Sequence, residues 1–164
     1  MTKPEQATIE TVPINQLTNH PANPRQGDIG AIAVSIQENG WYGTIVAQKS
    51  TGHVLAGNHR LQAAQQLGIE ELPVYWVDVD DIEARKILLA DNRTNDLATY
   101  NDEALADLLT SLAKTNDLAG TTYDGEDLDN LLSDLAELTP PEGFQSFDDE
   151  LETEHACPKC GYEF

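Results

Sequence analysis

The residues best suited to chemistry are Gly57-Asn58-His59-Arg60, which lie between the β-type run His53–Ala56 and a helix-forming segment. A strand that turns through glycine into a helix leaves main-chain N–H groups without partners at the helix start, where the helix dipole is positive. Arg60 adds a cation whose forked donors match phosphate oxygens. The stretch therefore predicts an anion site with phosphate as its natural occupant. Spacing alone leaves open an ordinary turn in which Arg60 pairs with a surface carboxylate.

His59 lies beside this predicted site and has two interpretations. An imidazole next to bound phosphates can act as a donor or as a general acid–base group. It can also do no more than hydrogen-bond a phosphate or a helix end, and we favour that interpretation. His20 and His53 are most simply loop and strand-end residues.

The only two cysteines, Cys157 and Cys160, form a C-x-x-C pair, and His155 lies close before them. The proline and the glycine of this stretch shape a tight turn that lets both sulfurs face one metal, as in half of a zinc ribbon. Zinc takes four ligands, so the others would come from elsewhere on the chain or from a second copy. The sequence predicts either a zinc site on Cys157, Cys160 and His155 or a free exposed dithiol.

Short strands and helices alternate over the first part of the chain and must position these residues. Hydrophobic patterns predict the elements, and turn residues and helix caps such as Asp28 and Asp80 or Asp81 mark their ends. The predicted strands are Thr11–Ile14, Ile45–Gln48, His53–Ala56 and Leu72–Val79, and the predicted helices are Ile29 to Asn39, Arg60–Leu67 and a third that runs to about Ala90.

The second part of the chain is acidic and predicted to be helical. Asn101 is suited to cap a helix over 102–114, and Asp124 starts another over 125–138, each with leucines on one face. These two apolar stripes should pack on each other or on the rest of the molecule. Lys114 is the sole basic residue between Asn101 and Leu138, whereas a DNA-reading helix needs Lys or Arg. We therefore expect a helical cap and no DNA reader.

Size and charge limit the function further. The 164 residues are enough for one compact domain with an appendage, and the formal net charge is −20. Residues 1–99 contain seven basic and twelve acidic residues, against two and seventeen in residues 100–164. Such a surface cannot bind a nucleic-acid backbone broadly, so any DNA contact is local or goes through a partner. Apolar runs are too short for a bilayer, and Met1–Thr11 lacks a secretory signal, which predicts a cytoplasmic protein.

Several short motifs occur in an order that resembles the N-terminal domain of ParB partition proteins and its sulfiredoxin-fold relatives. They are Asn23-Pro-Arg25, the helix ending at Asn39-Gly40, a strand hairpin, GNHRLQAAQQLG from Gly57, the strand through Val74–Val77, and LADNR over Leu89–Arg93. The likeness covers about Thr11 to Ala98. Later segments extend it to about Leu138 and are similar to ParB-like domains that phages and mobile elements carry, sometimes joined to DNA-modification methylases.

The resemblance implies an α+β fold, with a small mixed ParB/sulfiredoxin-like sheet, surrounding helices and a C-terminal helical extension. It also implies binding of a nucleoside triphosphate, which is CTP in partition proteins and ATP or ADP in some relatives. Several members are described as nucleases. The sulfiredoxin reaction itself is excluded, because Asn58 stands where those enzymes carry their reactive cysteine.

The resemblance also implies roles for particular residues. Gly57, Asn58, His59 and Arg60 would form the phosphate box, with Arg25 added from the early loop. Asp91, Asn92 and Arg93 would handle a metal-bound triphosphate, because Mg²⁺ prefers oxygen ligands such as the Asp91 carboxylate and the Asn92 carbonyl. Arg93 would neutralise phosphate oxygens together with Arg60. Asp91 and His59 are the candidate catalytic residues.

Together these observations predict a nucleotide-binding domain that acts in a DNA-related process, with slow hydrolysis switching its partner or oligomeric state. One alternative is a metal-dependent nuclease acting on DNA delivered by a partner. Another is an acidic adaptor or DNA mimic that docks a basic DNA-processing protein. The predicted organisation is a nucleotide-binding domain over 1–99, an acidic two-helix extension over 100–138, a flexible linker over 139–154 and a C-x-x-C knuckle over 155–164.

Overall fold

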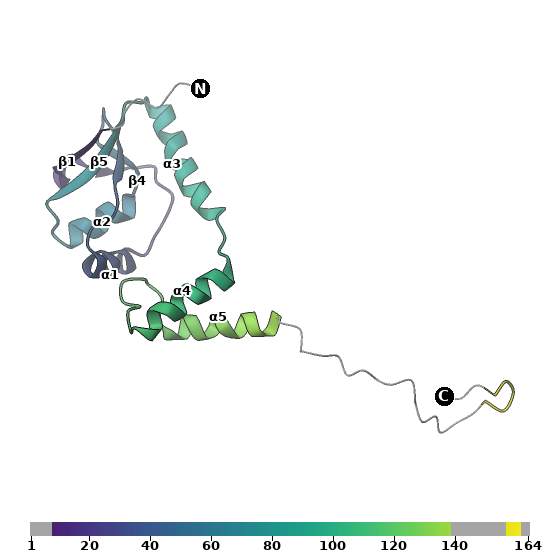
Figure 1. Ribbon diagram of the computed structural model, residues 1–164. Coiled ribbons are helices and arrows are strands. Elements are labelled where there is room, and N and C mark those ends of the chain that lie inside the picture. The colour runs from purple at the N-terminus through teal and green to yellow at the C-terminus, as the bar shows by residue number, and fades with distance from the viewer. Residues whose placement is uncertain (1–7, 139–156, 162–164) are drawn as a thin grey trace.

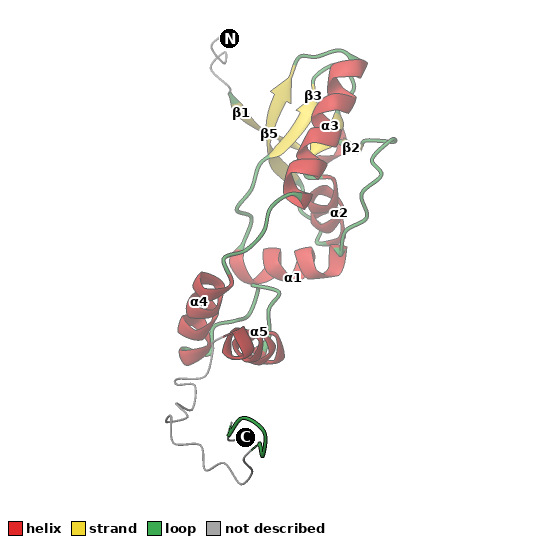
Figure 2. Cartoon of the chain, turned by 90° about the vertical axis from the view of Figure 1, so that its right-hand side faces the viewer, coloured by secondary structure: helices red, strands yellow, loops and turns green. Residues whose placement is uncertain are grey.

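A computed structural model of the chain describes residues 8–138 and 157–161 (Figure 1). The elements in chain order are β1 (Ile9–Pro13), the 3₁₀ turn η1 (Ile14–Gln16), β2 (Thr18–Asn19), α1 (Ile29–Asn39), β3 (Ile45–Gln48), β4 (His53–Ala56), α2 (Asn58–Gln66), β5 (Glu71–Val77), α3 (Asp81–Asp96), α4 (Asp102–Lys114) and α5 (Gly125–Leu138). Helices α1 to α3 lie around the sheet, and α4 and α5 lie beyond α1 (Figure 2).

The five strands form one mixed sheet in the order β1-β5-β3-β4-β2. The pairs β1–β5 and β3–β4 are antiparallel, whereas β3–β5 and β2–β4 are parallel. Strands β3 and β4 have the bounds that the sequence predicts, and β2 is a two-residue strand that the sequence analysis missed. This architecture confirms the predicted α+β fold with a small mixed sheet and surrounding helices.

The main hydrophobic core lies on the face of the sheet that α2 covers. Its members are aliphatic side chains from the strands, from the turn after β1 and from α2, namely Val12, Leu17, Ile45, Ala47, Val54, Leu61, Ala64, Leu72 and Val74. Helix α1 packs on α2 from the outside. The apolar face of α2 therefore fixes this helix against the sheet, and its polar start is left at the edge of the core.

Helix α3 packs against β4 on the opposite face. Val54 and Leu55 are consecutive in β4, so their side chains point to opposite faces of the sheet. Leu55 is fully buried, as are Ala84 and Leu88 on α3. Strand β4 is thus held between α2 and α3, and it ends at the turn that carries the predicted phosphate box.

Helix α3 is longer than the sequence analysis predicts, because it continues past Ala90 to Asp96. The Thr94 hydroxyl and the Asn95 amide each donate 2.8 Å hydrogen bonds to main-chain carbonyls one turn earlier, those of Ala90 and Asp91. These bonds satisfy polar side chains within the helix, although such residues rank low in helix propensity. Residues 91 to 93 are therefore helical.

Four of the five helices in residues 8–138 have their first turn capped by a side chain. The caps are Asp28 on α1, Asp80 on α3, Asn101 on α4 and the reciprocal pair Asp124 and Asp127 on α5. Helix α2 has none, since it starts at Asn58 after Gly57. Within residues 8–138 and 157–161 no helix has the length and apolar character needed to cross a membrane.

Helices α4 and α5 pack on each other, as the two leucine stripes predict. The loop between them contacts the end of α1, where the Asn39 amide donates a 3.0 Å hydrogen bond to the Gly120 carbonyl. A side chain at Gly120 would collide with Glu38 and Asn39, and its φ of +76° also favours glycine. This close contact places helices α4 and α5 beside α1.

Leu72→Ala should destabilise the fold by about 2–5 kcal/mol, because Leu72 is fully buried in the main core and its truncation leaves a cavity. Urea unfolding followed by circular dichroism measures the change. The matched control is Leu89→Ala on α3, where the leucine is 55% exposed and the change should stay within about 0.5 kcal/mol. Equal effects of the two variants would contradict the assignment of the core.

Candidate functional site

A pocket of about 200 Å³ lies where the start of α2, the loop after β2 and the C-terminal half of α3 meet. Its lining includes seven residues that the sequence analysis selected, namely Arg25, Gly57, Asn58, His59, Arg60, Asp91 and Asn92. Three segments that lie far apart in the sequence thus come together at this pocket.

A larger, open hollow of about 1000 Å³ lies over β1, β5 and the turn between β3 and β4. Its charged lining residues are Glu10, Lys49 and Asp78, so carboxylates outnumber the single cation. It also lacks an uncapped helix start. The smaller pocket is therefore the candidate site for an anionic ligand.

The start of α2 forms one wall of this pocket. Gly57 adopts a left-handed conformation with φ of +97°, and a side chain there would meet Ile45 and the Arg60 guanidinium. No side chain caps the helix, so the main-chain N–H groups of Asn58, His59 and Arg60 have no intrahelical or side-chain partner. Free N–H groups at the positive end of a helix are suited to bind an anion.

The Arg60 guanidinium lies over the same turn, packed between Gly43 and Gly57. A side chain at Gly43 would collide with the Arg60 Nη1 atom. Arg60 is half-buried and makes no hydrogen bond or ion pair within residues 8–138, so the surface-carboxylate alternative is not observed. An unpaired, partly desolvated guanidinium favours a charged partner such as phosphate.

The side chains of Asn58 and His59 bind the protein itself. Asn58 is 6% exposed, accepts a 2.9 Å hydrogen bond from the His20 N–H and donates a 3.0 Å bond to the Val54 carbonyl. The His59 ring lies against Gly27, with its Nε2 atom 3.1 Å from the Arg25 carbonyl oxygen. In this structure both side chains fix the loop after β2 to the start of α2, and Asn58 offers the pocket only its main chain.

Arg25 connects that loop to α3. Its guanidinium forms a 2.7 Å ion pair with Asp96 and donates a 2.8 Å hydrogen bond to the Asn92 carbonyl. The two side chains of the ion pair are 39% and 52% exposed, so solvent screens the attraction between them. Arg25 thus lies at the pocket with its charge already shared with Asp96.

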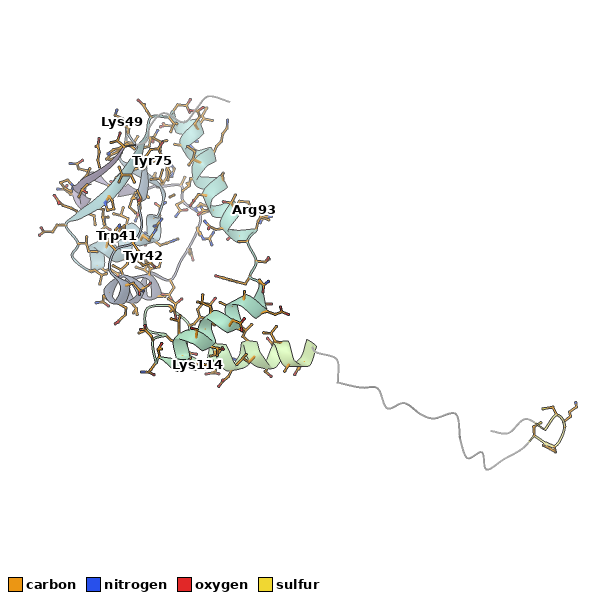
Figure 3. All side chains as sticks on the ribbon, in the orientation of Figure 1. Trp41, Tyr42, Lys49, Tyr75, Arg93 and Lys114 are labelled. Carbon is orange, nitrogen blue, oxygen red and sulfur yellow. The ribbon has the colours of Figure 1, made fainter. Side chains whose placement is uncertain are left out.

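Asp91 and Asn92 line the pocket from α3, whereas Arg93 does not. Arg93 is exposed and lies on the outer side of α3, because one helical step turns it away from its neighbours (Figure 3). The Asn92 amide donates to Asn23 Oδ1 at 3.1 Å. The Asp91 carboxylate makes no hydrogen bond or ion pair within residues 8–138. Of the three residues, the structure brings Asp91 and Asn92 to the site.

Sequence reasoning missed Asn23, Asn95 and Asp96. Asn23 belongs to the Asn-Pro-Arg motif that the resemblance already marks, so its motif was the available signal. Asn95 lies one helical turn after Asp91 and lines the pocket beside it. Extending the predicted helix past Ala90 would have placed Asn95 on the correct face.

Metal-ligating side chains do not form clusters in the described part of the chain. Residues 8–138 and 157–161 contain no group of three or more His, Cys, Asp or Glu side chains arranged to hold a metal ion. Cys157 and Cys160 are free thiols in a tight turn, and hydrogen bonds from the main-chain N–H groups of Lys159 and then Cys160 lower the pKa of Cys157. His155 lies outside the described residues.

His20 and His53 form a pair at the start of the loop after β2. The rings of His20 and His53 meet edge to face with centroids 5.4 Å apart, and His20 Nδ1 accepts a 3.1 Å hydrogen bond from the Ala22 N–H. Burial first, then the charges of His53 and Arg85, lower the pKa of His20, while Asp81 opposes them. The folded state therefore favours a neutral His20 ring.

This histidine pair predicts a pH-dependent part of the stability. Because the pKa of His20 is lower in the folded state than the usual 6.5, its contribution is complete above about pH 6.5 and is lost as the pH falls through the folded value. His20→Gln should therefore lose less unfolding free energy than the native chain between about pH 7 and pH 5.5. Urea titrations measure this loss, and NMR of the ring locates the midpoint. The prediction would be wrong if the unfolding free energies of the two proteins fell equally with pH. It would also be wrong if NMR showed the His20 ring titrating with a midpoint above 6.5.

Known proteins are similar to a large part of the chain. Two nucleoid occlusion proteins, from Geobacillus sp. (strain WCH70) and Bacillus cereus (strain B4264), are 26% and 28% identical to the chain over 113 and 105 residues. These stretches cover 65% and 60% of the chain but 40% and 36% of the relatives. The chain thus matches about two fifths of the length of these relatives.

A solved structure has the same fold. It is the C-terminally truncated chromosome-partitioning protein ParB from Caulobacter crescentus, complexed with CTP-γ-S. The TM-score is 0.66 at 23% identity, and the likeness covers 82% of this chain and 81% of that one. Residues 1–93, more than half of the chain, match the family described as the ParB N-terminal domain. The fold and this match confirm the resemblance in the sequence: the chain belongs to the ParB N-terminal domain family.

Proposed function

We propose that the chain binds a nucleoside triphosphate with Mg²⁺ in the pocket between the start of α2 and the end of α3, and that the bound nucleotide sets its partner or oligomeric state in a DNA-related process. One observation carries the proposal: the start of α2 and the adjacent Arg60 guanidinium both lack a side-chain partner among residues 8–138. The solved relative bound to CTP-γ-S makes CTP the first nucleotide to test.

The phosphates occupy the turn before α2. The main-chain N–H groups of Asn58, His59 and Arg60 donate to phosphate oxygens, and the helix dipole adds a favourable field. The Arg60 side chain supplies a charge-assisted bond that is stronger than a neutral one. Since Asn58 and His59 are held by main-chain partners, their amides are positioned before the ligand arrives.

The residues at the pocket fit a magnesium ion. Mg²⁺ in nucleotide sites uses one or two carboxylates together with phosphate oxygens and water. Asp91 offers a carboxylate without a partner in the described residues, and Asn92 keeps its side-chain oxygen free while its amide nitrogen bonds Asn23. Asp91 and Asn92 would hold the ion, which supplies positive charge to the triphosphate.

The base and sugar extend toward an adjoining apolar pocket of about 270 Å³. Ile32 and Arg60 line both pockets, so the two lie side by side. Trp41 and Tyr42 lie at the second pocket beside α1 and offer aromatic surface for a base (Figure 3). The proposal therefore separates a polar phosphate end from an apolar base end, with Arg60 between them.

If the nucleotide is hydrolysed, pocket residues that can accept a proton from the attacking water would act as the general base. Asp91 and His59 have this chemistry, and His59 already contacts the Arg25 carbonyl. Arg25 reaches phosphate once it leaves Asp96. The link to DNA rests on similarity to nucleoid occlusion proteins and to a chromosome-partitioning ParB. The phage or mobile-element context rests on the resemblance in the sequence alone.

Isothermal titration calorimetry with CTP, ATP, ADP and GTP, each with Mg²⁺, tests the proposal. We expect one triphosphate to bind best, and Arg60→Ala should weaken it by about tenfold or more, which is about 1.4 kcal/mol. Arg85→Ala is the matched control, because Arg85 is exposed on α3 and outside both pockets. If no nucleotide binds tighter than about 1 mM, the acidic-adaptor function replaces this proposal.

Asp96→Asn should strengthen triphosphate binding. Breaking the exposed Arg25–Asp96 pair costs about 0.2–1 kcal/mol, and the variant removes this cost, so the affinity should rise by up to about fivefold. The same titration measures it, with Asp134→Asn on α5 as a control that removes an equal charge outside the pocket. A weaker affinity in Asp96→Asn would show that Asp96 positions Arg25 for the ligand.

A further inference from the structure

The Cys157–Gly161 turn has a backbone arranged to hold two sulfurs together. The Gly161 N–H donates a 2.8 Å hydrogen bond to the Cys157 carbonyl, and Gly161 adopts a φ of +72°, where a side chain is unfavourable. A tight turn with C-x-x-C spacing lets two sulfurs face one metal. Cys157 and Cys160 are both free thiols, and Cys160 is exposed, so we call this turn the two-thiol clamp.

The described residues of one chain do not complete a zinc site around this clamp. The whole chain has two cysteines and four histidines, and His20, His53 and His59 belong to the α/β part. His20 and His53 contact each other, and His59 contacts the Arg25 carbonyl. No group of three ligating side chains occurs in residues 8–138 and 157–161. A tetrahedral structural zinc needs four ligands, so the clamp is half a site.

We propose that Cys157 and Cys160 of two copies of this chain bind one zinc ion between them as a tetrathiolate site. A twofold axis through the metal brings two identical clamps together, so the same turn serves both sides. Four thiols release four protons to the buffer as four zinc–sulfur bonds form, and no electrons are transferred. The second copy supplies ligands that one clamp lacks.

The negative charge of each chain is the reason that two copies would need a metal ion to pair at this turn. Each chain carries a formal charge of −20, so two copies repel each other unless a specific bond holds them. Zinc–thiolate bonds are short and directional, and they supply that attachment at one point. Added salt screens the repulsion, so zinc-dependent pairing should become stronger as the ionic strength rises.

The test uses the full chain without nucleotide, with the thiols kept reduced by a phosphine, before and after addition of Zn²⁺. We expect one zinc for every two chains by metal analysis, and light scattering should show the mass doubling from 18.0 kDa. A chelator should restore the monomer. Co²⁺ in place of zinc should give the intense visible absorption of a tetrahedral tetrathiolate. Cys160→Ser should lose the pairing and shift the Co²⁺ spectrum.

Matched variants separate this site from the nucleotide pocket. Lys159→Ala changes the turn without removing a sulfur and should still pair, and Asp91→Ala should pair with zinc whatever it does to nucleotide binding. One zinc per monomer, especially one lost in His155→Ala, would overturn the proposal. It would also be overturned by a pair that forms without zinc or by absence of zinc binding.

Discussion

The start of α2 is the constraint on which the rest of the site depends. In residues 8–138 the other four helices satisfy their first turn with their own Asp or Asn side chains. Helix α2 instead follows Gly57 in a left-handed conformation and keeps three N–H groups free. Exposed N–H groups at a helix start are costly unless water or an anion satisfies them. The Arg60 guanidinium and the Asp91 carboxylate gather around this one open end.

The pocket is held by hydrogen bonds that join three distant segments. Asn58 fixes the loop after β2 to the end of β4, and His59 contacts the Arg25 carbonyl. Arg25 in turn connects that loop to Asn92 and Asp96 on α3. A ligand that draws Arg25 away from Asp96 changes the contact between the loop and α3. The neutral His20 ring accepts a hydrogen bond from the Ala22 N–H in the same loop. Because the pKa of His20 is lowered by burial, the stability of this loop depends on pH.

Much of this arrangement could be predicted from the sequence because its signals are local. The β3–β4 hairpin, the Asp28 and Asn101 caps and the glycine turn before α2 each depend on neighbouring residues. The role of Asn58 could not be predicted, because its partner His20 lies 38 residues away. The end of α3 was missed because Thr94 and Asn95 rank low as helix formers, yet they bond back to the helix. That error hid Asn95, which lines the pocket, whereas the role of Arg93 came from the resemblance and Arg93 is not among the residues that line the pocket.

The amides at the start of α2 are where we expect the triphosphate to bind. A ¹H–¹⁵N NMR titration of the assigned chain with Mg²⁺ and CTP, or the nucleotide that binds best, observes those amides directly. We expect the largest shifts on Asn58, His59 and Arg60, with smaller ones on α3 around Asp91. Shifts centred instead on the open hollow near Lys49 and Asp78, with the amides of residues 58–60 unmoved, would contradict this expectation.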